Sequence, residues 1–230
     1  MIFKNNIKRA KFIKRPNRFN AHVLVDGKEE VVHVPNTGRC REILKEGATV
    51  ILREELNPSR KTRYDLMAVY KEDKLISIDS QVPNKVVREA LENGVIPSLK
   101  VYNLIEREKT FGKSRFDFKL SNDFGEEYYL EVKGVTLEFS GEARFPDAPT
   151  ERGTKHVLEL VEAKKQGKGA GILFLIQMEE VNNFRPNYEM DENFGKAVKF
   201  AKENGVDIFA YNCRVTEDSI SIFKEVKVRI

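Results

Sequence analysis

Two hydrophobic patterns divide the chain into an N-terminal and a C-terminal part. Through the first 80 residues, short stretches alternate apolar and polar positions between turn-forming residues, as strands buried on one face do. RCREILKEG (39–47) is the exception, because its pattern is that of a short helix. Five or six strands in a segment of this length predict a small closed all-β barrel of the OB type. The strand-like segments are residues 7–15, 19–27, 29–38, 48–56, 62–73 and 74–80.

After Asp79 the pattern changes, and helical periodicity appears at residues 83–94, 151–169 and 191–205. GAGILFLIQ (169–177) has no polar alternation and predicts a strand buried on both faces. The order helix, three strands, helix, strand, helix, strand predicts a mixed α/β sheet layer. We therefore expect two domains, residues 1–80 and 81–230, the second with further strands within 99–111, 115–134 and 206–216.

Composition narrows the class of protein. An apolar content of 40% with 15 Phe indicates a globular chain rather than a disordered one. The longest apolar run, GILFLIQM (171–178), is too short to span a bilayer, and the charged N-terminus lacks the apolar core of a signal peptide. We therefore expect a cytoplasmic protein with no membrane partner. Cys40 and Cys213 match no metal-binding spacing, which indicates buried or incidental thiols.

The net charge of +4 is unevenly distributed. Residues 1–80 hold 17 Lys and Arg against 11 Asp and Glu, whereas residues 81–230 hold 23 against 25. A basic cluster interleaved with phenylalanines opens the chain and suits a polyanion, with cations on the phosphates and rings on the bases. The alternative is an edge strand kept soluble by lysines. The cluster consists of Lys4, Lys8, Arg9, Lys11, Lys14, Arg15 and Arg18, and we take Lys11, Arg15 and Arg18 as candidate contacts to DNA or RNA.

The segment RFDFKLSNDFGEEYYLEVKG (115–134) alternates apolar and polar residues on both sides of a central turn. If the two arms pair around Phe124, residues whose numbers sum to 248 lie opposite each other. Phe116 then faces Val132 and Phe118 faces Leu130. These four side chains are expected to form one apolar face of the hairpin.

The other face of the hairpin is charged, with Asp117 opposite Glu131 and Arg115 opposite Lys133. Directly opposed Cβ atoms lie about 4.5–5.5 Å apart, and two carboxylates repel by roughly 4 kcal/mol at 4 Å and an effective dielectric near 20. A proton, a flanking cation or a divalent metal would relieve this repulsion. Mg²⁺ or Mn²⁺ is the productive choice, because an ammonium two residues beyond Glu131 could then orient a metal-bound water or stabilise a phosphorane. An acid followed by acid-x-lysine across a hairpin is the core of the PD-(D/E)xK nuclease fold. The alternative is a solvated face neutralised by Arg115, Lys119 and Lys133.

Six segments resemble the sugar fermentation stimulation protein A family and occur in order over most of the chain. The resemblance implies an OB-like N-terminal domain joined to a restriction-endonuclease-like C-terminal domain. It also implies DNA binding without sequence specificity and a link to sugar (maltose) metabolism. The segments are HVPNTGR (33–39), NPSRKTRYDL (57–66), VPNKVVREAL (82–91), FGKSRFDF (111–118), EVKGVTL (131–137) and FPDAPTERGTKHVLEL (145–160).

Carried over by position, the resemblance supports Asp117 and Glu131 as metal ligands and Lys133 as the catalytic lysine. Glu89, on the helix before the sheet, lies where nuclease relatives often place another acidic ligand, although a solvated helix glutamate is the simpler interpretation. Arg115 could contact the scissile phosphate in a bidentate manner or pair with Asp117.

Further basic residues are candidates for contacts to the nucleic-acid backbone. His156 and Glu159 lie on one face of the predicted helix, where His156 would reach a phosphate or serve a structural role. Two polar loops of the barrel could hold phosphates without reading sequence, or could simply be turns built on Asn, Gly and Pro. The candidates from these segments are Arg39, Arg60, Lys61, Arg63, Arg152 and His156.

Three functions remain open from the sequence. The first is a Mg²⁺- or Mn²⁺-dependent nuclease whose barrel grips DNA or RNA. The second is a non-catalytic DNA-binding regulator of sugar (maltose) metabolism with an idle acidic site. The third makes the barrel a protein-interaction module. No base-reading element such as a helix-turn-helix is evident, so we expect weak sequence specificity. Whether the chain forms a homo-oligomer is left open.

Overall fold

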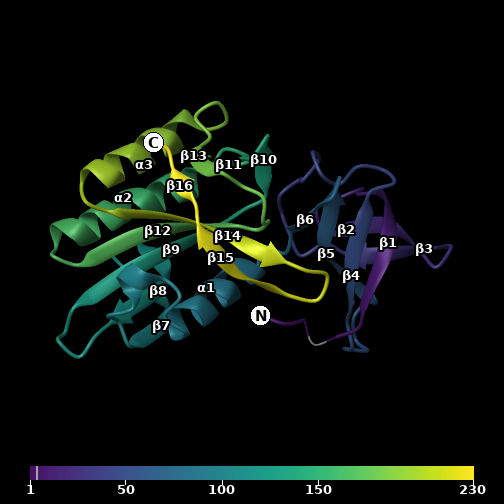
Figure 1. Cartoon of the computed structure of the whole chain (residues 1–230), viewed down its shortest axis with the longest axis horizontal. Coiled ribbons are helices and arrows are strands. Elements are labelled where there is room, and N and C mark those ends of the chain that lie inside the picture. Colours follow the sequence, from purple (N-terminus) through teal and green to yellow (C-terminus); the bar gives the residue numbers. More distant parts are fainter. Residues whose placement is uncertain (4) are drawn as a thin grey trace.

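The N-terminal part of the chain forms a β-barrel that lies beside a larger α/β unit (Figure 1). The computed structural model describes residues 1–3 and 5–230, so Lys4 of the basic cluster lies outside the described residues. The sheet order is β3-β2-β1-β4-β5-β6, and β3 returns to pair with β5 through His33 and Asp65. This pairing closes the sheet and confirms the predicted barrel. Its strands are β1 (Ile7–Lys14), β2 (Asn20–Val25), β3 (Lys28–His33), β4 (Thr49–Glu54), β5 (Tyr64–Lys71) and β6 (Lys74–Ser77).

Alternation along the strands produces the barrel core. In β2, Ala21, Val23 and Val25 are buried, whereas the residues between them point outward. The prediction of a short helix at residues 39–47 is wrong. The segment forms turns instead, in which the Leu44 N–H donates to the carbonyl of Cys40 and the Ala48 N–H to that of Lys45. Cys40 has a φ of 49°, a left-handed value that an α-helix does not contain.

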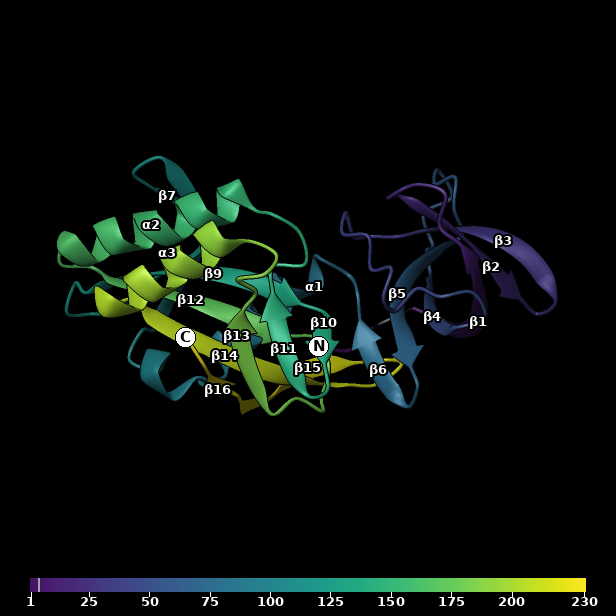
Figure 2. The same ribbon diagram turned by 90° about the horizontal axis from the view of Figure 1, so that it is seen from above.

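The C-terminal part is built on a six-stranded mixed sheet with the order β15-β14-β12-β9-β8-β7. Strand β12 pairs in parallel with both β9 and β14 and is buried on both faces, as its continuous apolar run predicts. Helix α1 packs on one face of this sheet, while α2 and α3 cover the other (Figure 2). The elements are α1 (Val82–Glu92), the 3₁₀ turn η1 (Pro97–Leu99), β7 (Leu104–Phe111), β8 (Ser114–Ser121), β9 (Glu127–Val135), α2 (Glu151–Lys165), β12 (Gly169–Ile176), α3 (Glu192–Glu203), β14 (Asp207–Val215) and β15 (Ile220–Glu225).

A second, smaller sheet in this part was not predicted from the sequence. It joins four short strands in the order β10-β11-β13-β16, and it stands between the main sheet and the barrel side of the molecule (Figure 2). The strands have only two to four residues each, too few for alternation to become visible. Strand β15 was also missed. The short strands are β10 (Leu137–Phe139), β11 (Glu142–Phe145), β13 (Asn183–Pro186) and β16 (Lys227–Val228).

Buried and half-buried polar contacts fix the barrel against the α/β unit. The buried Gln177 side chain donates to the carbonyl oxygens of Ser77 and Asp79, which lie at the end of the barrel. Tyr70 of β5 donates its hydroxyl to Glu217, in the turn between β14 and β15. These hydrogen bonds hold the two units in one arrangement. In the described part of the chain, no helix is long and apolar enough to cross a membrane.

Candidate metal centre and nucleic-acid groove

The candidate metal centre lies where β8 and β9 separate. Phe118 pairs with Leu130, as the predicted register requires. The ladder does not continue through Asp117. Instead, Oδ2 of Asp117 accepts a hydrogen bond from the N–H of Val132 at 2.8 Å. A carboxylate thus replaces a main-chain acceptor, and the strands open around it.

The opening also changes which face Phe116 occupies. Phe118 packs in the core on the α1 side of the sheet, but Phe116 packs on the α2 side, with its ring 5.9 Å from those of Tyr129 and His156. The prediction that four hairpin residues share one apolar face is therefore wrong for Phe116. The distortion at Asp117 extends to β7, where Glu108 has a φ of 54°, and strict alternation fails at this point.

Glu131 is buried on the α2 side of the sheet. Its Oε1 accepts hydrogen bonds from Nζ of Lys133 at 2.5 Å and from Nδ1 of His156 at 2.7 Å. Burial alone would raise the pKa of Glu131, but the hydrogen bond from His156 and the charge of Lys133 outweigh it and hold this pKa below its usual value. The Oε2 atom is buried and has no hydrogen-bond partner among the described residues.

Asp117 is the second carboxylate of the pair. Burial, and next the negative charge of Glu131, raise the pKa of Asp117 above its ordinary value. Its Oδ1 accepts a hydrogen bond from Nδ2 of Asn84 at 2.7 Å, so helix α1 supports the site from the other side of the sheet. Sequence reasoning missed Asn84, whose only signal was its position in the VPNKVVREAL segment.

These residues fit a divalent cation. Glu131 offers a buried oxygen without a partner, and the repulsion that raises the pKa of Asp117 would be relieved by a positive ion. No set of three or more His, Cys, Asp or Glu side chains that could share a metal occurs in residues 1–3 and 5–230. Two carboxylates suit Mg²⁺, which usually keeps several waters or takes substrate oxygens for its other positions.

The structure does not bring Glu89 to this pair. Glu89 lies on α1, and its Oε2 is 2.8 Å from the amino group of Met1, which also donates to the carbonyl of Ile220 on β15. Arg115 is exposed, with Nη1 3.4 Å from Oε2 of Glu108, so it pairs with β7 rather than with Asp117.

Helix α2 orients His156 toward the metal centre. The helix begins at a Thr150 cap, whose Oγ1 accepts from the N–H of Gly153 at 3.1 Å. The buried His156 ring points inward to Glu131, and Nε of the exposed Arg152 lies 3.5 Å from its Nε2. The geometry therefore makes His156 a support for Glu131 rather than a phosphate contact.

Several predicted phosphate contacts of the barrel are engaged within the protein. Arg60 donates to both Asp65 and Glu55, which gives it a structural role. Arg63 donates to Glu54. Lys61 is exposed in the same loop, and Lys11 donates to Thr49 on the neighbouring strand.

Arg15 also has an internal role. Its guanidinium donates to the carbonyl oxygens of Asn36, Gly38, Arg39 and Arg18, so it shapes the loop after β3. This use of every terminal nitrogen on carbonyl oxygens leaves Arg15 little capacity for a phosphate.

A groove of about 1050 Å³ runs between the barrel and the α/β unit. Arg18 and Arg39, predicted from the sequence, line it together with Arg41 and Arg144, which were not predicted. Arg18, Arg39 and Arg41 are exposed and form no ion pair within the described chain. Arg144 lies across the groove, on β11. A groove with cations on both walls suits a phosphate backbone.

Comparisons with known proteins account for both parts of the chain. Residues 13–78 match the family model described as the SfsA N-terminal OB domain, and residues 81–219 match the sugar fermentation stimulation protein RE domain. The chain belongs to the sugar fermentation stimulation protein A (SfsA) family. This match confirms the predicted family, the OB-type barrel and the restriction-endonuclease-like C-terminal domain.

Relatives of this SfsA family member match over full length. Sugar fermentation stimulation protein homologs from Clostridium tetani and Clostridium botulinum are 68% and 65% identical; the alignments cover 99% of this chain and of the first relative, and 100% of this chain and of the second. The solved structure of SfsA from Pyrococcus furiosus in complex with Ca²⁺ superposes with a TM-score of 0.89 at 29% identity, covering 100% of both chains.

Proposed function

We propose that this SfsA protein is a divalent-metal-dependent nuclease that cleaves phosphodiesters without strong sequence specificity. The observation that carries the proposal is the buried, unpartnered Oε2 of Glu131 beside Asp117, whose pKa is raised. Such a pair is expected where carboxylates await a cation. The complex of the Pyrococcus furiosus relative with Ca²⁺, another ion that prefers oxygen ligands, supports it.

Each residue of the centre has a distinct task in this proposal. Asp117 and Glu131 would hold Mg²⁺ or Mn²⁺, which would supply an activated water and neutralise charge on the phosphate. Lys133 places its ammonium at the same carboxylate and can stabilise negative charge that develops on the phosphoryl oxygens. His156 donates to Oε1 of Glu131 and so leaves Oε2 as the oxygen offered to the metal.

The groove is the proposed path of the nucleic acid, DNA or RNA. Its exposed arginines, Arg18, Arg39 and Arg41, would bind phosphates from the barrel side, and Arg144 from the opposite wall. Contacts of this kind position a strand and do not read its sequence. The proposed phosphate contacts thus lie mainly in the groove rather than in the loop at residues 57–63.

One observation favours a second candidate, a non-catalytic DNA-binding regulator of sugar metabolism. Only two carboxylates meet at the centre among the described residues, fewer than a site with a dedicated third acidic ligand would have. The groove would serve this function equally well, because phosphate binding does not require the centre.

A cleavage assay separates the two candidates. Purified protein is incubated with fluorescent single- and double-stranded DNA in Mg²⁺, Mn²⁺ or EDTA, beside Asp117→Ala and Lys133→Ala. We expect metal-dependent cleavage that falls by at least about 10²-fold in either variant, since both act on the transition state. Lys155→Ala is the matched control, because Lys155 is an exposed lysine on α2 that contacts the carbonyl of Lys113.

Two results of this assay would contradict the nuclease proposal. Residual cutting that is equal in the native protein and both variants would mean contamination. DNA binding without cleavage in any metal would leave the regulator as the function.

A further inference from the structure

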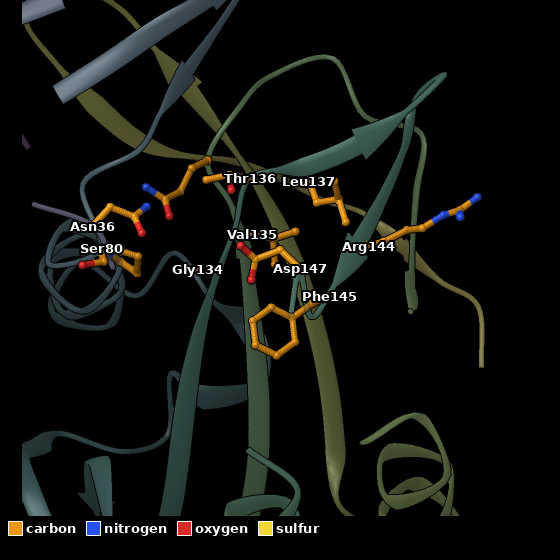
Figure 3. A pocket seen from close by; sticks show the side chains of 11 residues that line it. Asn36, Ser80, Gly134, Val135, Thr136, Leu137, Arg144, Phe145 and Asp147 are labelled. Atoms are coloured by element: carbon orange, nitrogen blue, oxygen red, sulfur yellow. The ribbon is translucent and has the colours of Figure 1, made fainter. Parts of the chain in front are cut away.

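A small pocket opens between the two units, beside the end of β9. Its volume is about 120 Å³, and side chains from both units line it (Figure 3). Asn36 and Ser80 stand on one side, and the carboxylate of Asp147 and the ring of Phe145 on the other. Gly134 forms the floor, where a Cβ would lie 2.5 Å from Oε1 of Gln177. The pocket has room for a few water molecules, at about 30 Å³ each, or for one flat ring system.

The pocket adjoins both the metal centre and the groove. Gly134 directly follows Lys133 on β9, so the pocket floor and the metal centre are formed by neighbouring residues of one strand. Leu137, Arg144 and Asp147 line the pocket and the groove alike, so the two spaces are continuous. A strand held in the groove with a phosphate at the metal centre would therefore place a nearby base at the pocket.

The amide donors beside the pocket are already in use. The amide nitrogen of Asn36 donates to the carbonyl of Ile78, that of Gln177 donates to Ser77 and Asp79, and Nε of Arg144 donates to Glu142. The amides of Asn36 and Gln177 therefore present little donor capacity to a ligand, whereas the two terminal nitrogens of Arg144 stay available where the pocket meets the groove.

Acceptors, in contrast, remain open. Asp147 has no hydrogen bond or ion pair to any side chain or main-chain group in the described residues, and its Oδ2 lies close to Gly38, where a Cβ would come within 3.1 Å. Figure 3 shows its carboxylate directed into the space between the lining residues. Oε1 of Gln177 is a further open acceptor beside Gly134. On the side of Asp147, the pocket thus suits a ligand edge that donates.

A carboxylate in a groove lined by arginines weakens phosphate binding. A nucleic acid gains from Asp147 only through a donor that it places against the two carboxylate oxygens. Guanine has two adjacent donors, N1–H and the N2 amino group, on its Watson–Crick edge. Adenine and cytosine present a ring acceptor beside their amino group, and thymine and uracil flank their single N–H with carbonyl oxygens. A carboxylate therefore fits guanine better than any other base.

We propose that this pocket binds an unpaired guanine, with Asp147 accepting from N1–H and N2–H and Phe145 supplying an apolar wall. The inference rests on the proposed function and narrows its substrate to nucleic acid in which a guanine is free of its partner, either single-stranded or turned out of a duplex. It adds a preference for one base to a groove whose other proposed contacts, to phosphates, do not read the sequence.

The test measures the affinity for three fluorescein-labelled oligonucleotides by anisotropy, with Ca²⁺ in place of Mg²⁺ or Mn²⁺ to limit cleavage. They are dT12, dT12 with one central deoxyguanosine, and dT12 with deoxyinosine, which lacks the N2 amino group, at that position. The native protein is expected to bind the guanine-containing strand roughly 5- to 150-fold more tightly than dT12, the range of one bidentate base contact. Deoxyinosine should lose most of this gain.

Asp147→Asn is the decisive variant, because an amide keeps the size of the side chain but offers only one acceptor. Its preference for guanine should fall to within about twofold. Glu42→Gln is the matched control, since Glu42 lines the groove but not the pocket, and it should keep the preference.

The outcomes distinguish the two levels of the proposal. Equal binding of dT12 and the guanine strand by the native protein, or a preference that survives in Asp147→Asn, would overturn the guanine pocket and leave the nuclease standing. Failure to bind any of the three strands would overturn the nucleic-acid function itself, and the pocket with it.

Discussion

Asp117 performs a structural task while carrying a charge that the fold disfavours. One oxygen accepts from the N–H of Val132 and the other from Asn84, yet burial and the neighbouring Glu131 raise its pKa. A raised folded pKa means that the stability contributed by this group is present below the unfolded value of about 3.8 and is lost as the pH rises through the folded value. Ionisation of Asp117 therefore destabilises the metal-free protein.

Replacing this charge should stabilise the fold while it abolishes the proposed function. Asp117→Asn keeps an acceptor for Val132 N–H, so we expect about 0.5–2 kcal/mol greater stability at pH 7 in EDTA. The gain should shrink as the pH falls through the folded pKa and disappear below 3.8, where the carboxyl is neutral in both states. Urea unfolding of the variant and of the native protein between pH 7 and pH 3 measures this difference in stability. A variant less stable than the native protein at pH 7 would contradict the interpretation, and Asp117→Ala, which orphans the Val132 N–H, should be destabilised.

For single residues, the sequence predicted which side chains carry the chemistry better than it predicted their hydrogen-bond and ion-pair partners. Period-two alternation correctly placed Glu131 and Lys133 on one face of β9, and the register centred on Phe124 holds for Phe118 and Leu130 but fails at Asp117, where the strands open. The partners of Arg15 and Arg60 could not be predicted in the same way. Whether an arginine meets a carbonyl, a carboxylate or a phosphate depends on which distant segments fold against it.

At the scale of elements, one buried carboxylate closes the barrel. Asp65 on β5 accepts from His33 on β3, from Arg53 on β4 and from Arg60 in the loop before β5. It lies at the point where β3 returns to β5. Burial alone would raise the pKa of Asp65, but the two arginines and the histidine outweigh it and lower this pKa to about 2. The carboxylate therefore ties three strands and a loop together.

The pH dependence of stability should report this closure. Because the folded pKa of Asp65 is depressed from 3.8 to about 2, its contribution is present above about pH 4 and is lost as the pH falls toward 2. The shift corresponds to about 2 kcal/mol. The free energy of unfolding of Asp65→Asn, measured with urea, should be lower than that of the native protein by at least this much at pH 7 and by less at pH 3. Asp73→Asn, an exposed acid in the β5–β6 turn, is the control and should change stability by less than about 0.5 kcal/mol. An equal loss at both pH values would rule out the ionic closure.

Elements with a long pattern were predictable, and short ones were not. Alternation over predicted segments of seven or more residues gave the barrel strands, and periodic apolar positions gave α1, α2 and α3 to within a few residues. The strands of the small sheet have too few residues to show a period, and they exist because β11 and β13 pair across about 40 residues of chain. The left-handed Cys40 broke the helix that its neighbours favoured.

On the scale of the whole molecule, the groove belongs to neither unit alone. Arg18, Arg39 and Arg41 come from the barrel and Arg144 from β11, and the contacts of Gln177 and Tyr70 keep the two walls in place. No pattern within one domain could have shown this surface, because it exists only once the two units are docked. The sequence located the positive charge in the first 80 residues but not the side of the barrel that presents it.

The dependence of binding on salt can identify that side. For single strands, the slope of log K against log[salt] is about −0.7 per phosphate neutralised. Arg41→Ala should therefore make the slope shallower by about 0.7 on dT12, and Arg18→Ala/Arg41→Ala by about 1.4. Arg63→Ala removes an exposed arginine that pairs with Glu54 on the barrel, and it should leave the slope unchanged. If Arg63→Ala flattened the slope while the groove variants did not, the strand would instead follow the loop at residues 57–63.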